Sequence, residues 1–296
     1  MIRGTIKFLA LSTAMLGVSA FGAMAADPVA EAGLISSGYA DVFAAYSFLG
    51  GDFGSEDDEF LSGGGAFRWS MPVGDAMSLQ LDAAGEITEN SGSNEADYEN
   101  SIGGALHLSY RDPSSHLFGI FGGVLNSGVG DNGSVDGYFI GGEGQYYADM
   151  NTFYVQAGYL DGKTSNDDTD DDGVLGDAWF ARGVWRHYFS EVTRLSLEGS
   201  YANGQVDEEP DTDVIGWGAE LETAPADWPM SVYLGYEGSY YDQEPGESDT
   251  LDEHMIKIGA RFDFGAGSVF ERDRLGAGLD TPRFGRWLGI AGGPLE

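Results

Sequence analysis

The chain has no cysteine and, after its first 25 residues, no long apolar segment. The lack of cysteine excludes a disulfide framework, so an exported chain of this size depends on hydrogen bonding and packing. The lack of apolar runs of about 20 residues argues against spanning helices in the mature chain. Basic residues are also few, because 14 Lys and Arg stand against 49 Asp and Glu, a formal net charge of −35. That balance argues against a nucleic-acid partner, whose phosphates need Lys and Arg.

Residues 1–25 have the pattern of a cleaved secretory signal. Arg3 and Lys7 provide the basic start, an apolar stretch follows, and residues 23–25 form an Ala-x-Ala cleavage motif. The alternative is an N-terminal membrane helix, which the shortness of the apolar stretch disfavours. We therefore expect the mature chain to begin at Ala26. Loss of the two basic residues takes its formal charge from −35 to about −37.

The mature chain alternates apolar and polar residues in short runs, and this period of two predicts β-strands. Its 47 Gly, 17 Phe, 15 Tyr and 6 Trp against 9 Pro suit a β-protein with tight turns. We count about twelve runs of roughly ten residues, the length that a tilted strand needs to cross a bilayer. The predicted strands are residues 37–48, 61–71, 77–88, 101–111, 117–126, 137–148, 152–161, 177–189, 193–203, 214–223, 230–241 and 254–264.

The joints between the predicted strands alternate in kind. Every second joint is long and acidic, and the joints between them are tight turns. This sorting predicts an all-β, up-and-down antiparallel transmembrane barrel with long acidic extracellular loops and short periplasmic turns. An even number of strands also puts both ends of the barrel on the short-turn side. The long joints are residues 50–60, 89–100, 127–136, 162–176, 204–213 and 242–253.

Several strands have one uniformly apolar face and an opposite face that carries charges. In residues 254–264, for example, Ile256 and Ile258 alternate with Lys257 and Arg261. A buried core in a soluble protein cannot hold that many charges cheaply, whereas a wet lumen can. The pattern therefore favours a transmembrane barrel, with its apolar face toward lipid, over a soluble ligand-binding barrel.

Seven basic residues fall in the half of their strands nearest the short turns, in the register that we interpret as inward. A belt of Arg and Lys favours anions that pass through a pore. The alternative is a structural network, in which inward acids pair with the belt and close the lumen. The predicted lumen or constriction residues are Arg68, Arg111, Arg182, Arg186, Arg194, Lys257, Arg261, Glu143, Glu198 and Glu220.

Two further groups of residues bear on calcium binding and on catalysis. The first half of a calcium loop is present in Asp168, Asp170 and Asp172, but the closing bidentate Glu is missing. The alternatives are a weak surface site for Ca²⁺ and a solvated acidic loop tip, and no other cofactor is expected. His107 and Ser109 share an inward face without an oxyanion motif, so we predict that the chain is not an enzyme.

The last predicted strand ends at residues 262–264, which resemble the terminal aromatic signal of barrel proteins. The chain nevertheless continues beyond this strand. The extension is nearly balanced in charge and more basic than the rest. It either stays in the periplasm, folds up against the acidic wall and plugs the lumen, or is disordered. The predicted organisation is a signal peptide (1–25), a periplasmic segment (26–36), a barrel (37–264) and this tail (265–296).

In its architecture the mature chain resembles Gram-negative outer-membrane β-barrel proteins of the porin-like kind. Its start, Ala26-Asp27-Pro28-Val29, is similar to that of several alphaproteobacterial outer-membrane proteins. The resemblance implies a narrow channel for passive diffusion of small polar or charged solutes, or a closed barrel with a structural or surface-interaction role. It also implies a place in the cell outer membrane, contact with its lipid and lipopolysaccharide, and insertion by the barrel-assembly machinery. Porins are often trimers, which leaves a homo-oligomer open.

Overall fold

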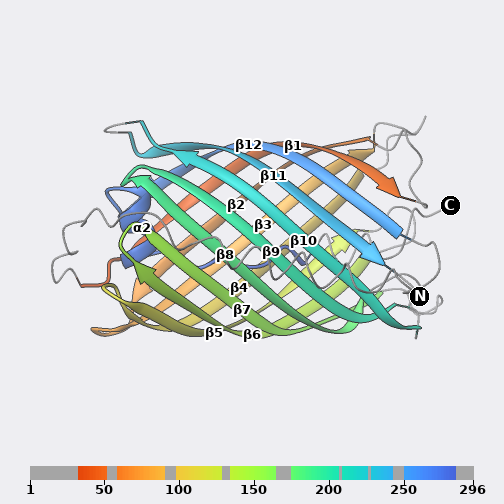
Figure 1. Ribbon diagram of the computed structural model, residues 1–296, viewed down its shortest axis with the longest axis horizontal. Coiled ribbons are helices and arrows are strands. Elements are labelled where there is room, and N and C mark those ends of the chain that lie inside the picture. The colour runs from red at the N-terminus through yellow and green to blue at the C-terminus, as the bar shows by residue number, and fades with distance from the viewer. Residues whose placement is uncertain are drawn as a thin grey trace, which may run out of the picture.

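Twelve antiparallel strands close into a barrel in which each strand pairs with its neighbours in sequence (Figure 1). Strand β1 closes the barrel by pairing with β12, with Gly38 opposite Phe264. This confirms the predicted fold class. The computed structural model describes residues 33–51, 59–90, 98–128, 134–164, 175–206, 209–225, 228–242 and 250–284.

The strands extend beyond most of the predicted limits by a few residues, because the backbone ladder continues where the apolar alternation fades into polar residues. In the part of the chain that the structure describes, no helix combines the length and apolar character needed to traverse a bilayer. The elements are β1 (Ser37–Gly51), β2 (Glu59–Pro72), β3 (Met77–Asn90), β4 (Tyr98–Asp112), β5 (His116–Gly128), β6 (Ser134–Ala148), β7 (Asn151–Thr164), β8 (Gly176–Ser190), β9 (Thr193–Val206), β10 (Glu209–Thr223), β11 (Met230–Asp242), β12 (Thr250–Phe264) and α2 (Val269–Leu275).

The joint between β9 and β10 differs most from its prediction. A long acidic joint was expected over residues 204–213, but the two strands pair through most of this range, with a register shift between Pro210 and Thr212. Backbone N–H and C=O groups pair whatever the charge of the side chains, so acidic composition alone did not end the strands. The central parts of the other five long joints lie outside the described residues.

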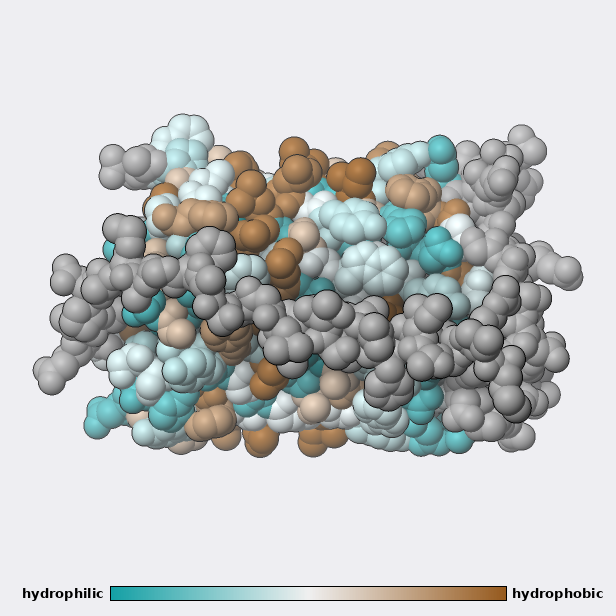
Figure 2. Space-filling view, in the orientation of Figure 1, coloured by the Kyte–Doolittle hydropathy of each residue, from teal (hydrophilic) through white to brown (hydrophobic). Residues whose placement is uncertain are grey.

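The outer surface of the barrel is apolar over its middle. Ile258 is 63% exposed, whereas its neighbour Lys257 is 8% exposed and points inward. Figure 2 shows hydrophobic side chains gathered across the central part of the barrel. Burial thus follows the alternation along the strand, with the charged face turned into the lumen. An exposed apolar band of this extent suits contact with lipid.

The chain turns back into the barrel at Gly265. This residue has φ +81°, a conformation that favours glycine, and a Cβ added there would lie 2.2 Å from the Ser36 carbonyl oxygen. Helix α2 then lies at the end of the barrel that carries the short turns, which we call the turn end (Figure 1). The Phe270 amide donates to the Glu191 carbonyl there, over 2.9 Å. Residues 265–284 are called the C-terminal segment below.

Candidate functional site

Five of the seven basic residues of the predicted belt lie in the half of their strands nearest the turn end. The other two differ from the prediction: Lys257 is at the centre of β12, and Arg182 is one residue beyond the centre of β8, away from the turn end. The seven residues come from β2, β4, β8, β9 and β12. Six are buried, and the Arg68 side chain keeps 17% of its surface exposed. We call this set the arginine belt: Arg68, Arg111, Arg182, Arg186, Arg194, Lys257 and Arg261.

On the side formed by β9 to β12, the belt is paired within the wall of the barrel. Arg261 donates to both carboxylate oxygens of Glu220, over 2.8 and 2.7 Å. Arg194 lies 2.7 Å from Glu222, a carboxylate that is also 2.8 Å from Arg261. Charge-assisted bonds of this kind offset the cost of placing the ions in a partly dry lumen.

Two further predicted acids have different roles. Glu198 accepts two bonds from Arg182, over 2.8 and 2.6 Å. Glu143 instead accepts from the Tyr154 hydroxyl at 2.5 Å and lies 2.9 Å from Nδ1 of His107. The other ring nitrogen of His107 is 3.5 Å from Asp82. His107 was not predicted as a member of this charged network, and its inward position beside acidic strands was the available signal.

Helix α2 is docked against the belt by its charged residues. Arg272 makes two bonds to Glu222, over 2.8 and 2.9 Å, pairs with Asp263 and lies over the Tyr39 ring at 4.7 Å. The Ser268 side chain caps the helix by accepting from the Glu271 amide. A helix of this length is marginal alone, so its contacts with the wall stabilise it.

The next residue of the helix, Asp273, is almost fully buried and pairs with Arg186. Its second carboxylate oxygen accepts from the Thr152 hydroxyl at 2.7 Å. Burial raises the pKa of Asp273, but the charges of Arg186 and Arg274 outweigh that effect and hold the pKa below its ordinary value. Asp273 is therefore ionised at neutral pH at the turn end of the lumen.

Beyond the helix, the C-terminal segment runs inside the lumen without regular secondary structure and bonds to several strands through its backbone. Gln80 on β3 donates to the Leu279 carbonyl at 2.9 Å and accepts from the Leu279 amide at 3.2 Å. Gln145 on β6 donates to the Gly278 carbonyl at 2.9 Å. Gln156 on β7 donates to the Asp280 carbonyl at 2.7 Å. Inward glutamines thus satisfy a peptide backbone that has left the sheet.

Asp280 lies among three arginines of the belt. Its carboxylate pairs with Arg68 and with Arg186, and lies 3.4 Å from Arg182. Burial raises the pKa of Asp280, but the charges of Arg186, Arg68 and Arg182 outweigh that effect and hold the pKa well below its ordinary value. Asp280 was not predicted as a site residue, because its partners lie about 100 and 200 positions earlier in the chain.

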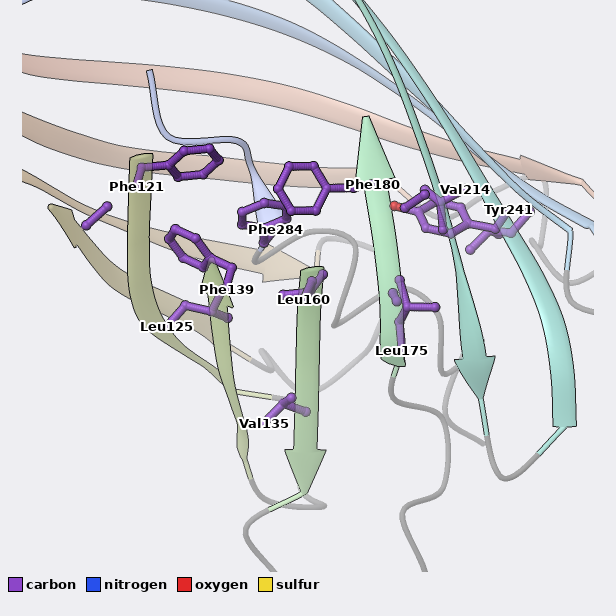
Figure 3. Packing of buried hydrophobic residues seen from close by; sticks show 14 residues of the cluster. Phe121, Leu125, Val135, Phe139, Leu160, Leu175, Phe180, Val214, Tyr241 and Phe284 are labelled. Carbon is purple, nitrogen blue, oxygen red and sulfur yellow. The ribbon is translucent and has the colours of Figure 1, made fainter. Parts of the chain in front are cut away.

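The segment ends its described course in an apolar cluster inside the barrel. Phe284 lies 4.7 Å from Phe139 and 4.8 Å from Phe180, measured between ring centroids. Figure 3 shows these rings together with Phe121, all pointing toward one another from β5, β6, β8 and the segment. Tilted and edge-to-face ring contacts of this kind add to the burial of apolar area.

A cavity of about 310 Å³ remains in the lumen beside the segment. Its lining includes the belt residues Arg68, Arg182 and Arg186 together with Asp280 and Thr281 of the segment. A charged space therefore remains among the described residues of the lumen, and the C-terminal segment borders it.

The predicted calcium-loop residues Asp168, Asp170 and Asp172 lie outside the described residues. Within the described ranges, no group of three or more His, Asp or Glu side chains is arranged to hold a metal ion. His107 and Ser109 do not pair with each other: Ser109 bonds the Ser78 hydroxyl at 2.8 Å, and His107 bonds Glu143.

No protein-family model and no curated protein sequence matches the chain. Solved structures do match it. An outer membrane channel from Pseudomonas putida F1 has a TM-score of 0.55 at 10% identity, and the match covers 81% of this chain and 100% of that chain. The fold is that of an outer-membrane β-barrel. A KdgM porin matches with a TM-score of 0.45 at 12% identity, over 76% of this chain and 99% of that chain.

The prediction that the chain is not an enzyme was wrong as an exclusion. An outer membrane phospholipase from Salmonella typhi, a dimer with bound calcium, also matches, with a TM-score of 0.48 at 11% identity, over 75% of this chain and 90% of that chain. That neighbour is an enzyme by its name. Catalysis needs only a few side chains placed together in space, so the lack of a recognised motif in the sequence does not exclude it.

Proposed function

We propose that the protein is a channel of the bacterial outer membrane for passive diffusion of small polar or charged solutes, closed at the arginine belt by its C-terminal segment. The observation that carries the proposal is the ionised lumen inside an apolar outer wall. Such a lumen suits water and ions, and the exposed apolar band suits lipid and lipopolysaccharide. The predicted secretory signal at residues 1–25 fits export to this membrane.

The belt gives the proposed channel a preference for anions once the segment leaves. Asp273 and Asp280 both belong to the segment, so its departure removes the two carboxylates that now face Arg186. Arg272, Arg274 and Arg283 leave with the segment, so the belt itself is the source of the expected preference. Rings of Arg select anions in pores. We therefore expect the double change Arg182→Glu and Arg186→Glu to lower anion preference in the open state. An unchanged reversal potential in a salt gradient would show that the belt does not set the ion selectivity.

A closed barrel with a structural role is the second candidate, and the filling of the lumen by the segment favours it. Planar-bilayer recordings of the full chain separate the two. The channel proposal predicts rare openings in the wild type and frequent openings when Arg272→Gln and Arg274→Gln loosen helix α2. Lys163→Gln, an exposed change near the other end of the barrel, is the matched control. Recordings without steps above background in any of the three proteins would refute the channel and support the closed barrel.

A further inference from the structure

One carboxylate of the C-terminal segment occupies a site that the wall of the barrel builds from three guanidinium groups. Asp280 faces Arg68 through one oxygen, and Arg186 and Arg182 through the other. Arg182 and Arg186 also lie over the Tyr154 ring, at 5.8 and 5.2 Å. Planar guanidinium groups held this way are well suited to carboxylate geometry.

The described part of the wall supplies no anion to Arg186, whereas it gives Arg182 the carboxylate of Glu198 and places Asp82 3.4 Å from Arg68. Every hydrogen-bond acceptor of Arg186 found among the described residues belongs to the segment: Asp273, Asp280 and the Gly278 carbonyl. Arg186 is nevertheless only 2% exposed. A buried guanidinium without an anion is costly. Arg186 differs in this from Arg194 and Arg261, which pair with Glu220 and Glu222 of the wall itself.

The site is reachable from the remaining cavity. The Asp280 side chain keeps 22% of its surface exposed, and it lines the cavity together with Arg68, Arg182 and Arg186. The volume of about 310 Å³ is at the lower end of the range for small-molecule sites. A small solute in the cavity would meet the arginines at the place where Asp280 now sits.

We propose that Arg68, Arg182 and Arg186 form a binding site for the carboxylate groups of small organic anions, and that Asp280 occupies it as an internal competitor. A solute carboxylate that takes this place releases the segment from the belt. The inference rests on the proposed channel function and names its solute class. On this proposal the segment is a gate, and its Asp280 carboxylate is the same chemical group that the admitted solutes carry.

Binding of radiolabelled succinate to the full chain in detergent tests the site directly. Asp280→Asn removes the competitor and keeps the arginines, so it should bind succinate at least about tenfold more tightly than the wild type. Adding Arg186→Gln to that variant should abolish the gain. Glu271→Gln, which neutralises a carboxylate of the same segment outside the belt, should behave as the wild type. Binding by Asp280→Asn no tighter than the wild type, or binding that survives Arg186→Gln, overturns the site.

A measurement on the unaltered protein keeps the proposal testable if a variant fails to fold. Trypsin cleavage after Arg272 and Arg274 reports release of the segment, because these residues are 2% and 4% exposed when it is docked. Succinate should accelerate this cleavage severalfold, whereas neutral succinamide should not. Acceleration matched by sodium chloride of equal ionic strength would reduce the effect to charge screening and overturn the proposal.

The two proposals fail separately. Succinate binding and cleavage are measured in detergent and need no conductance. If succinate binding and cleavage behave as expected while bilayers show no conductance, the carboxylate site is supported and the channel proposal is refuted. If bilayers conduct but succinate neither binds nor releases the segment, the channel proposal is supported and the carboxylate site is refuted.

Discussion

Replacing Asp273 by Asn removes a buried anion and leaves the shape of the side chain nearly unchanged. The carboxylate pairs with Arg186, accepts from Thr152 and has Arg274 at 3.9 Å, and its side chain has no exposed surface. An Asn oxygen can still accept from Thr152. The change therefore isolates the charge of Asp273 from its hydrogen bond.

The expected cost is large because a buried partner is left behind. Breaking a buried ion pair by removing one ion costs about 3–5 kcal/mol. Arg186 keeps Asp280 and the Gly278 carbonyl, so we expect the lower end, about 3 kcal/mol. At 1.4 kcal/mol for each factor of ten, docking of the segment should weaken about a hundredfold.

Amide hydrogen exchange of helix α2 in detergent micelles measures this loss. Seven residues do not hold a helix in water, so the protection of the α2 amides comes from docking. We expect exchange to quicken about a hundredfold in Asp273→Asn and to change little in Glu271→Gln. Unchanged exchange in Asp273→Asn would refute the view that buried charge pairs hold the segment.

Three more predictions address the other forces. Ile258→Arg on the lipid face should lower the free energy of unfolding in bilayers by about 2–4 kcal/mol, measured by urea titration, whereas Asp75→Arg in an exposed turn should have little effect. Phe284→Ala should weaken docking by about 3–5 kcal/mol, read as faster trypsin cleavage after Arg274; wild-type cleavage rates would argue against the aromatic cluster. Asp273 and Asp280 have lowered pKa values when docked, so docking should be fully stable above their ordinary pKa of 3.8 and be lost as pH falls through the lowered values. Bilayer conductance should accordingly rise as the pH falls below about 4. An equal rise in the double variant Asp273→Asn with Asp280→Asn would show that protonation of these two carboxylates is not its cause.

The barrel could be predicted from the sequence because its signals are local. Alternation of Ile256 and Ile258 with Lys257 and Arg261 sets which side chains face outward, and this pattern repeats along one strand at a time. The placement of most belt residues near the turn end followed in the same way. Where the signal was composition alone, as in the joint between β9 and β10, the strand limits were wrong.

The filling of the lumen could not be predicted, because it depends on contacts between distant parts of the chain. Gln80 and Leu279, for example, are 199 positions apart and meet only once the barrel has closed. The sequence left the tail either outside or inside the barrel. Neither the charge nor the hydropathy of Asp280 distinguishes it from a solvent-exposed acidic residue.

The central claim is that the C-terminal segment closes the lumen by supplying carboxylates to the arginine belt. Single-channel recording of the full chain with Asp273→Asn and Asp280→Asn together, beside the wild type, tests it most directly. The account predicts a wild type that is mostly closed and a double variant that is mostly open and prefers anions. A wild type that conducts as freely as the double variant, or a double variant that stays closed, would contradict it.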